Sequence, residues 1–129
     1  MYKNMVICGV VFAMLSVVFG AFGAHTLKSM VSEEALTTFE VGVRYQMYHA
    51  LGLLFIGMSH FLTRAVQKPV FIFFTLGIFL FSGSIYLLSL NAVLPFDARV
   101  IGFVTPLGGT CFIIGWLYFL FKIIKLKSI

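Results

Sequence analysis

The sequence predicts an all-α, polytopic membrane protein: a bundle of four transmembrane helices, with an amphipathic helix leading into the second span. Three observations predict this fold class. Of the 129 residues, 61% are hydrophobic and 10% are charged, whereas a soluble domain carries about 25% charged residues. The mean hydropathy is +1.10. The apolar residues also fall into four runs, each close to the roughly 20 residues that a helix needs to cross a bilayer. Four spans use up the chain, so we expect a single domain over residues 1–129.

The net charge of +5 raises the question of a nucleic-acid partner. The basic residues flank the apolar runs, however, and form no stripe interleaved with aromatic residues on a soluble surface. We therefore expect no nucleic-acid partner, and membrane lipids instead.

The first span is predicted at about residues 4–24. Its apolar run is longer than the 7–15 residues of a signal-peptide core, so we interpret it as a retained helix. Small residues recur along it and predict a face on which another helix packs closely. These residues are Gly9, Ala13, Ser16, Gly20 and Ala24.

An amphipathic helix is predicted to follow and to run into the second span, at about residues 45–63. Ser32 is a suitable N-cap for it, and Glu33 and Glu34 in the first turn complement the helix dipole. Gly42 is a candidate hinge between the amphipathic part and the span.

The third and fourth spans are predicted at about residues 69–90 and 100–124. The basic segment 64–68 is expected to be a short hairpin loop, which makes the second and third spans antiparallel neighbours. Pro106 removes the donor to the Gly102 carbonyl and is expected to kink the fourth span.

Other residues of the fourth span suggest how it packs. Its glycines permit close helix contact, and they are Gly108, Gly109 and Gly115. Trp116 and Tyr118 are expected near the membrane interface at its far end. Cys8 and Cys111 lie in different apolar runs, and we expect both to be free thiols.

The distribution of basic residues predicts the orientation in the membrane. With four spans, one side collects six basic residues and no acid: Lys3, Arg64, Lys68, Lys122, Lys125 and Lys127. The other side collects three basic residues and all four acids: Lys28, Arg44, Arg99, Glu33, Glu34, Glu40 and Asp97. This asymmetry predicts an inner-membrane protein with both termini in the cytoplasm.

The same topology gathers polar side chains at the outer end of the bundle, and these are the candidate ligand-binding residues: His25, Glu40, Arg44, Tyr45, Tyr48, His49, Ser82 and Tyr86. On a helix Glu40, Arg44 and Tyr48 share one stripe, so an ion pair and a cation–aromatic contact are both within reach. Ionisable residues near a membrane are candidates for function because desolvating them is costly. The alternative is that Glu40 and Arg44 only tie down the loops.

Four stretches, in this order, resemble a known family. They are GAFGAH at 20–25, YQMYHAL at 45–51, FSGSIYL at 81–87 and TPLGG at 105–109, followed by the Gly-Trp pair at 115–116. The chain is similar to the small membrane proteins of domain of unknown function 423, a family that includes transmembrane protein 256. The resemblance implies a compact four-helix membrane protein and points to no particular activity.

Three functions are compatible with these features. The first is a non-enzymatic module that binds or transports a small ligand or lipid through the outer polar cluster. Transport would require a homo-oligomer. The second is an assembly subunit that docks another membrane protein through the small-residue faces. The third is a haem or metal protein that uses His25 and His49, which are expected at similar depth, although lone histidines are more often structural. We predict no catalytic residue, cofactor or resident metal.

Overall fold

The computed structural model describes residues 1–127, and every regular element among them is helical, as the sequence predicts. The α-helices are α1 (Lys3–His25), α2 (Glu33–Met58), α3 (Arg64–Gly77), α4 (Ser84–Ser89) and α5 (Val104–Lys125). A π-helical segment, Ile78–Gly83, joins α3 to α4 into one continuous stretch. Short 3₁₀ turns lie at Leu27–Ser29, Asn91–Val93 and Ala98–Ile101.

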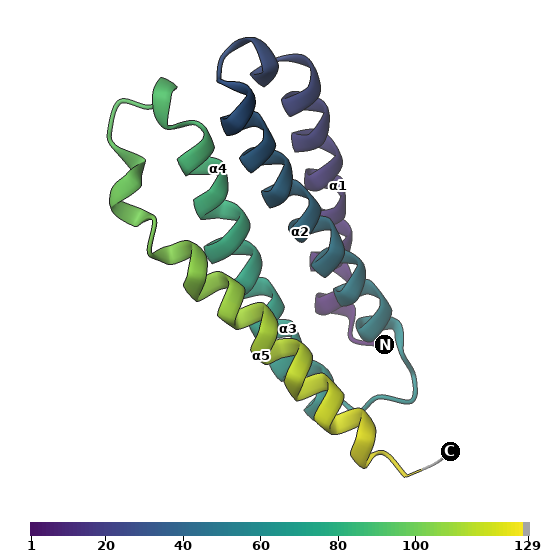
Figure 1. Cartoon of the computed structure of the whole chain (residues 1–129). Coiled ribbons are helices and arrows are strands. Elements are labelled where there is room, and N and C mark those ends of the chain that lie inside the picture. The colour runs from purple at the N-terminus through teal and green to yellow at the C-terminus, as the bar shows by residue number, and fades with distance from the viewer. Residues whose placement is uncertain (128–129) are drawn as a thin grey trace.

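The helices form two antiparallel hairpins that lie side by side (Figure 1). One hairpin is α1 and α2, and the other is the stretch from α3 to α4 together with α5. α2 packs on α1, on the π segment and on α4, so it joins the two hairpins. The N-terminus, the 59–63 loop and the end of α5 lie together at what we call the terminal end. The 26–32 and 90–103 connections lie at the opposite, loop end (Figure 1).

Within the described part of the chain, three helical stretches are long and apolar enough to cross a membrane: Lys3–Ser29, Arg64–Ser89 and Ala98–Lys125. α2 is not among them, although it has 26 residues. It carries Glu40, Arg44, Gln46 and His49, which lower its mean hydropathy. By length and composition alone, three of the four expected spans are thus apolar enough to cross a membrane.

The tightest contact face of α1 uses small residues spaced seven apart. Gly9, Ser16 and Gly23 are buried. A Cβ added to Gly9 would lie 2.9 Å from Leu54 Cγ, and one added to Gly23 would lie 3.2 Å from the Phe39 ring. A spacing of seven residues keeps one face of a helix against its neighbour, as in left-handed helix pairs.

The other small residues of α1 are placed less tightly. A Cβ on Gly20 would lie 3.6 Å from Val43 Cγ1, an ordinary contact. Ala13 is half-buried and Ala24 is exposed. A turn of helix takes about 3.6 residues, so residues spaced by four drift around the helix. Some of them therefore lie on the packing face and others at its edge.

The connection between the two hairpins differs from the expectation. α2 ends at Met58, five residues early, and residues 64–68 form the first turn of α3 instead of a loop. The loop is 59–63. The buried side chain of Gln67 explains this: its Nε2 donates to the carbonyl oxygens of Ile56 (2.8 Å) and Ser59 (3.2 Å). These bonds satisfy the last carbonyls of α2: that of Ile56 also accepts a longer bond from the Ser59 N–H, at 3.3 Å, and that of Ser59 follows the helix end.

The two prolines within helices are accommodated in different ways. The predicted kink at Pro106 is wrong, because α5 begins at Val104 and Pro106 lies in its first turn, where backbone N–H groups have no intrahelical acceptor. Pro69 lies deeper, inside α3. It leaves the Ala65 carbonyl without its usual donor, and that oxygen accepts a hydrogen bond from the Tyr118 hydroxyl at 3.1 Å.

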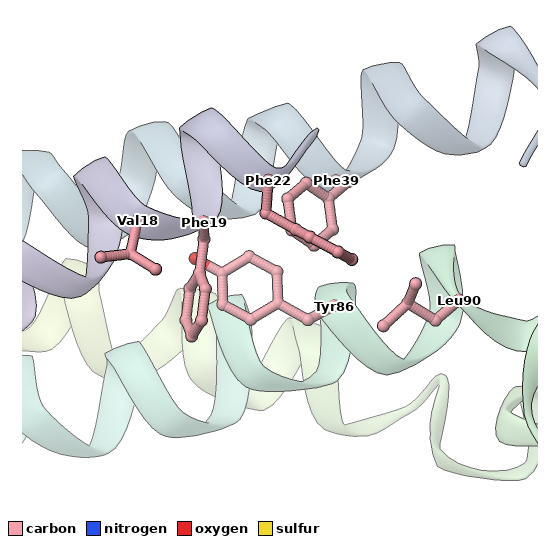
Figure 2. A pocket seen from close by; sticks show the side chains of 6 residues that line it. All are labelled: Val18, Phe19, Phe22, Phe39, Tyr86 and Leu90. Atoms are coloured by element: carbon pink, nitrogen blue, oxygen red, sulfur yellow. The ribbon is translucent and has the colours of Figure 1, made fainter. Parts of the chain in front are cut away.

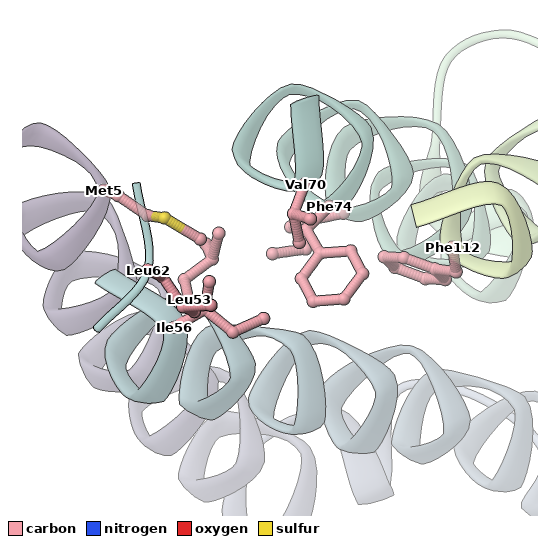
Figure 3. Packing of buried hydrophobic residues seen from close by; sticks show 8 residues of the cluster. Met5, Leu53, Ile56, Leu62, Val70, Phe74 and Phe112 are labelled. Carbon is pink, nitrogen blue, oxygen red and sulfur yellow. The ribbon is translucent and has the colours of Figure 1, made fainter. Parts of the chain in front are cut away.

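The apolar core lies between the hairpins, mainly toward the terminal end (Figure 3). Its buried members are Met5, Leu53, Ile56, Leu62, Val70, Phe74, Ile78 and Phe112. Many of the buried polar side chains lie farther toward the loop end. The apolar core therefore fixes the frame in which the candidate site is held.

Candidate functional site

Gln46 of α2 connects three helices through its side-chain amide. Its Nε2 donates to the Phe12 carbonyl of α1 at 2.9 Å, and its Oε1 accepts from the Tyr86 hydroxyl of α4 at 2.6 Å. Gln46 is buried. One turn earlier, the Gly42 carbonyl accepts a bond from Ser82 Oγ at 2.7 Å. The polar groups between α2 and α4 thus satisfy one another.

His49 of α2 is buried among aromatic rings. Its Nδ1–H donates to the Tyr45 carbonyl at 2.7 Å, and its Nε2 accepts from Trp116 Nε1 of α5 at 3.0 Å. Because an indole N–H only donates, this arrangement identifies the neutral Nδ1–H tautomer. The imidazole also stacks on Phe112, with 3.5 Å between ring centroids and 9° between planes. The ring is therefore held on both edges and on one face.

The π-helical segment lies between glycines of α2 and α5. A Cβ on Gly108 would overlap the backbone nitrogen of Phe81 in the π segment, and Ser82 of the same segment bonds the Gly42 carbonyl. A Cβ on Gly42 would lie 2.8 Å from the ring of Tyr86, just beyond the segment in α4. The absence of a side chain at Gly42 therefore lets α4 approach α2 closely. α2 runs unbroken through Gly42, so the hinge expected there is absent. π-helical turns often occur at functional sites.

The structure divides the predicted ligand-binding residues instead of gathering them into one pocket. Ser82 and His49 are buried and Tyr86 is half-buried, whereas Tyr45 is exposed although its ring stacks beside that of His49. The remaining four are exposed: His25, Glu40, Arg44 and Tyr48.

The expected pairing of Glu40 with Arg44 does not form. Within residues 1–127 the ion pair is Asp97 with Arg99, at 3.0 Å, in the loop before α5. The Arg99 guanidinium there holds the pKa of the Asp97 carboxyl below its usual value. Both Glu40 and Arg44 extend from α2 without a partner in the described part of the chain, so they do not tie down a loop.

His25 and His49 do not lie at the same depth, so the hypothesis that they share a haem or metal ion is wrong. A Cβ on Gly9 would lie 3.0 Å from the Ala50 carbonyl oxygen, next to His49. His49 is thus level with the first half of α1, roughly 20 Å along the axis from His25. Its ring also turns toward Trp116 of α5, away from α1.

The small-residue faces are used within the chain. Gly9 and Gly23 pack on α2, and Gly108 and Gly115 pack on the stretch from α3 to the π segment. Gly109 is looser, because its Cβ would lie 3.7 Å from Phe81. Most of these glycines therefore do not offer the docking surface that the assembly hypothesis requires.

Sequence reasoning missed Gln46 and the bond of Trp116 to His49. Gln46 could have been found, because an amide at the centre of a hydrophobic helix needs a partner. Trp116 was expected near the far interface; its side chain is 44% exposed, and its indole N–H donates to His49.

Two neighbouring cavities lie between α1 and the stretch from the π segment to α4, and together we call them the α1–α4 groove. The upper cavity has a volume of about 390 Å³ and is lined by Val18, Phe19, Phe22, Phe39, Tyr86 and Leu90 (Figure 2). The lower has about 230 Å³ and is lined by Phe12, Leu15, Phe19, Gln46, Ile78, Phe79, Gly83 and Tyr86. They share Phe19 and Tyr86, whose rings meet edge to face at 5.2 Å.

A separate groove, of about 340 Å³, lies between α2 and α5. Its lining is mainly aromatic: Tyr45, His49, Phe81, Gly109, Phe112, Ile113 and Trp116. The polar atoms of His49 in it are already hydrogen-bonded.

Comparison with known proteins gives a consistent result. The family model described as "Protein of unknown function (DUF423)" matches residues 19–109. The UPF0382 membrane protein SSP2132 of Staphylococcus saprophyticus is 44% identical over 89% of this chain and 92% of its own length. YwdK of Bacillus subtilis, also a UPF0382 membrane protein, is 38% identical over 95% of this chain and 98% of its own. The UPF0382 inner membrane protein YgdD of Escherichia coli is 34% identical over 97% of this chain and 92% of its own. No solved structure matches.

Proposed function

The chain belongs to the DUF423 family of membrane proteins, and from this premise we propose that it is a four-span inner-membrane protein that binds a lipid acyl chain in the α1–α4 groove. The proposal has two parts, the topology and the ligand, and each has its own support.

The fourth span is α2, because it lies along the whole length of α1. The Tyr2 N–H donates to the Gly57 carbonyl at 2.7 Å near the terminal end, and Gly23 packs on Phe39 near the loop end. Its polar side chains Gln46 and His49 are hydrogen-bonded inside the bundle, which reduces the cost of removing them from water.

The charge distribution supports a cytoplasmic terminal end. The N-terminus, α3 and α5 bring Lys3, Arg64, Lys68, Lys122 and Lys125 to that end. The loop end carries the acids Glu33, Glu34 and Asp97. This matches the excess of Lys and Arg on the cytoplasmic side of membrane proteins. The name of the Escherichia coli relative, an inner membrane protein, supports the choice of membrane and not the orientation.

The groove itself is the observation that carries the ligand assignment. Between Phe12 and Phe22 it follows α1 for ten residues, or about 15 Å. This is half the roughly 30 Å thickness of the hydrocarbon core, the depth of one leaflet. The walls are aromatic and aliphatic, and the polar atoms of Gln46 and Tyr86 are bonded to each other. A saturated chain therefore leaves no donor unpaired there.

The part of the groove lined by Phe22 and Leu90 lies nearest the loop end, where a lipid headgroup would sit. His25 is three residues beyond Phe22 and is exposed. We assign it to the headgroup, while Tyr86 contacts the chain. In this arrangement the lipid comes from the outer leaflet.

Filling the groove tests the ligand. A Cβ at Gly83 meets nothing within 4 Å, and Gly83 lines the lower cavity. Gly83→Phe should therefore place a ring in the groove without disturbing the fold. Ile114→Phe, at an exposed position on α5, is the matched control. Native mass spectrometry in mild detergent counts bound phospholipid, and a melting curve verifies folding.

The parent and Ile114→Phe should retain a phospholipid that Gly83→Phe loses. Equal phospholipid in a folded Gly83→Phe protein would rule out the groove as the binding site.

A further inference from the structure

α2 carries an exposed stripe that no other element within residues 1–127 covers. Its members recur at intervals of three and four residues, and we call them the α2 outer stripe: Thr37, Glu40, Arg44, Tyr48, Leu51, Phe55 and Met58. The half toward the terminal end is strongly apolar, with Phe55 69% exposed and Leu51 52% exposed. The half toward the loop end is charged.

The charges lie at a depth where the other helices expose only uncharged side chains. Val43 contacts Gly20 of α1, five residues before that helix ends at His25. Arg44, next to Val43, is therefore about 8 Å below the end of α1 along the axis. Residues 4–24, 69–89 and 104–121 contain no Asp, Glu, Lys or Arg. A surface that faces lipid at this depth avoids charge, because ionised groups are costly in hydrocarbon.

We propose that the α2 outer stripe is the interface of a parallel homodimer, in which Glu40 of each copy pairs with Arg44 of the other. This inference rests on the proposed crossing of the membrane by α2 and is independent of the lipid groove.

A second copy of the chain satisfies both charges at once. In a two-fold interface, residue i contacts j while j contacts i, so two Glu40–Arg44 pairs form together. Helical side chains point toward the N-terminus, which brings the Arg44 guanidinium toward the level of Glu40. An anionic lipid would satisfy Arg44 and leave Glu40 unpaired. The charge pattern therefore favours the second copy.

The remainder of the stripe supplies the apolar seam. Tyr48, Leu51, Phe55 and Met58 follow one another at intervals of three, four and three residues. This is the alternation of a and d positions in a parallel coiled coil. Two copies related by an axis along the membrane normal would bring these side chains together below the charges.

Cysteine cross-linking in membranes tests the geometry. In a background with Cys8→Ser and Cys111→Ser, Phe55→Cys should form a disulfide-linked dimer on mild oxidation. Ile72→Cys, which is 47% exposed on α3, is the matched control and should not. Equal cross-linking at both positions, or none at Phe55→Cys, would overturn the proposal.

Charge exchange tests the pairing. Arg44→Glu or Glu40→Arg alone should weaken dimerisation at least about tenfold, since four like charges then meet. The double variant Glu40→Arg with Arg44→Glu should restore it. Each single variant should melt like the parent when monomeric, because both side chains are exposed. Unchanged dimers in the single variants, failure of the double variant, or cross-linking to a different protein would each contradict the proposal. Gly83→Phe should lose lipid and still dimerise, which separates the two proposals.

Discussion

The indole N–H of Trp116 donates a hydrogen bond to Nε2 of His49 across 3.0 Å, and this bond joins α5 to α2 within the bundle. The same imidazole donates to the Tyr45 carbonyl and stacks on Phe112. Both ring nitrogens are thus engaged, and the site orients His49 as a structural group between the hairpins.

Trp116→Phe should destabilise the protein by about 1–2 kcal/mol, because it leaves the buried Nε2 of His49 without its donor while keeping an aromatic ring beside Phe74. Thermal melting in detergent, followed by circular dichroism, measures the loss. In a double-mutant cycle with His49→Leu, the combined change should cost less than the sum of the two single changes. Additive losses would show that the bond contributes nothing.

Tyr86→Phe should cost about 1–3 kcal/mol, because the buried Oε1 of Gln46 loses its 2.6 Å donor. Ser82→Ala is the matched control on the same helical stretch. The Gly42 carbonyl that Ser82 bonds lies within α2 and keeps its backbone partner, so this change should cost less than about 1 kcal/mol. If the two variants melt alike, Gln46 does not depend on Tyr86.

Much of the fold could be predicted from hydrophobicity and local signals. The all-helical class is confirmed, and so is the N-cap at Ser32, whose Oγ accepts from the Ala35 N–H at 3.1 Å. Cys8 and Cys111 are free, as expected. These features depend on residues close together in the chain. The end of α2 does not, because it is stabilised by Gln67, which lies beyond the loop.

The candidate site was harder to predict, because a helical stripe identifies a face without saying which neighbour meets it. Glu40 and Arg44 share a stripe, as the spacing predicts, yet that stripe faces outward. His49 lies on another face and meets Trp116, 67 residues later in the chain. The π-helical segment also escapes prediction, since it requires the close contact with Gly108 that only the folded protein supplies.

The proposed topology predicts which loops can be labelled from outside the cell. In a background without Cys8 and Cys111, Ala92→Cys should react with a membrane-impermeant maleimide, and Thr63→Cys should react only after the membrane is opened. Both positions are exposed. Labelling of Thr63→Cys in intact cells would mean that the terminal end faces outward, opposite to the proposed orientation.

Gly108→Ala should disrupt the bundle, whereas Gly109→Ala should be tolerated. A Cβ at Gly108 would overlap the Phe81 backbone nitrogen and lie 2.6 Å from the Leu80 carbonyl carbon. Backbone cannot rotate away as a side chain can, so α5 must separate from the π segment, and overpacking of this kind costs about 1–3 kcal/mol or more.

A Cβ at Gly109 would instead lie 3.7 Å from the Phe81 ring, an ordinary contact, and alanine favours the helix. The two variants share the same chemistry and differ by one position, so composition and expression are matched. Their melting temperatures in one detergent measure the difference, and Gly108→Ala should also yield less monodisperse protein. Equal stability of the two would mean that α5 does not approach the π segment as closely as this packing requires.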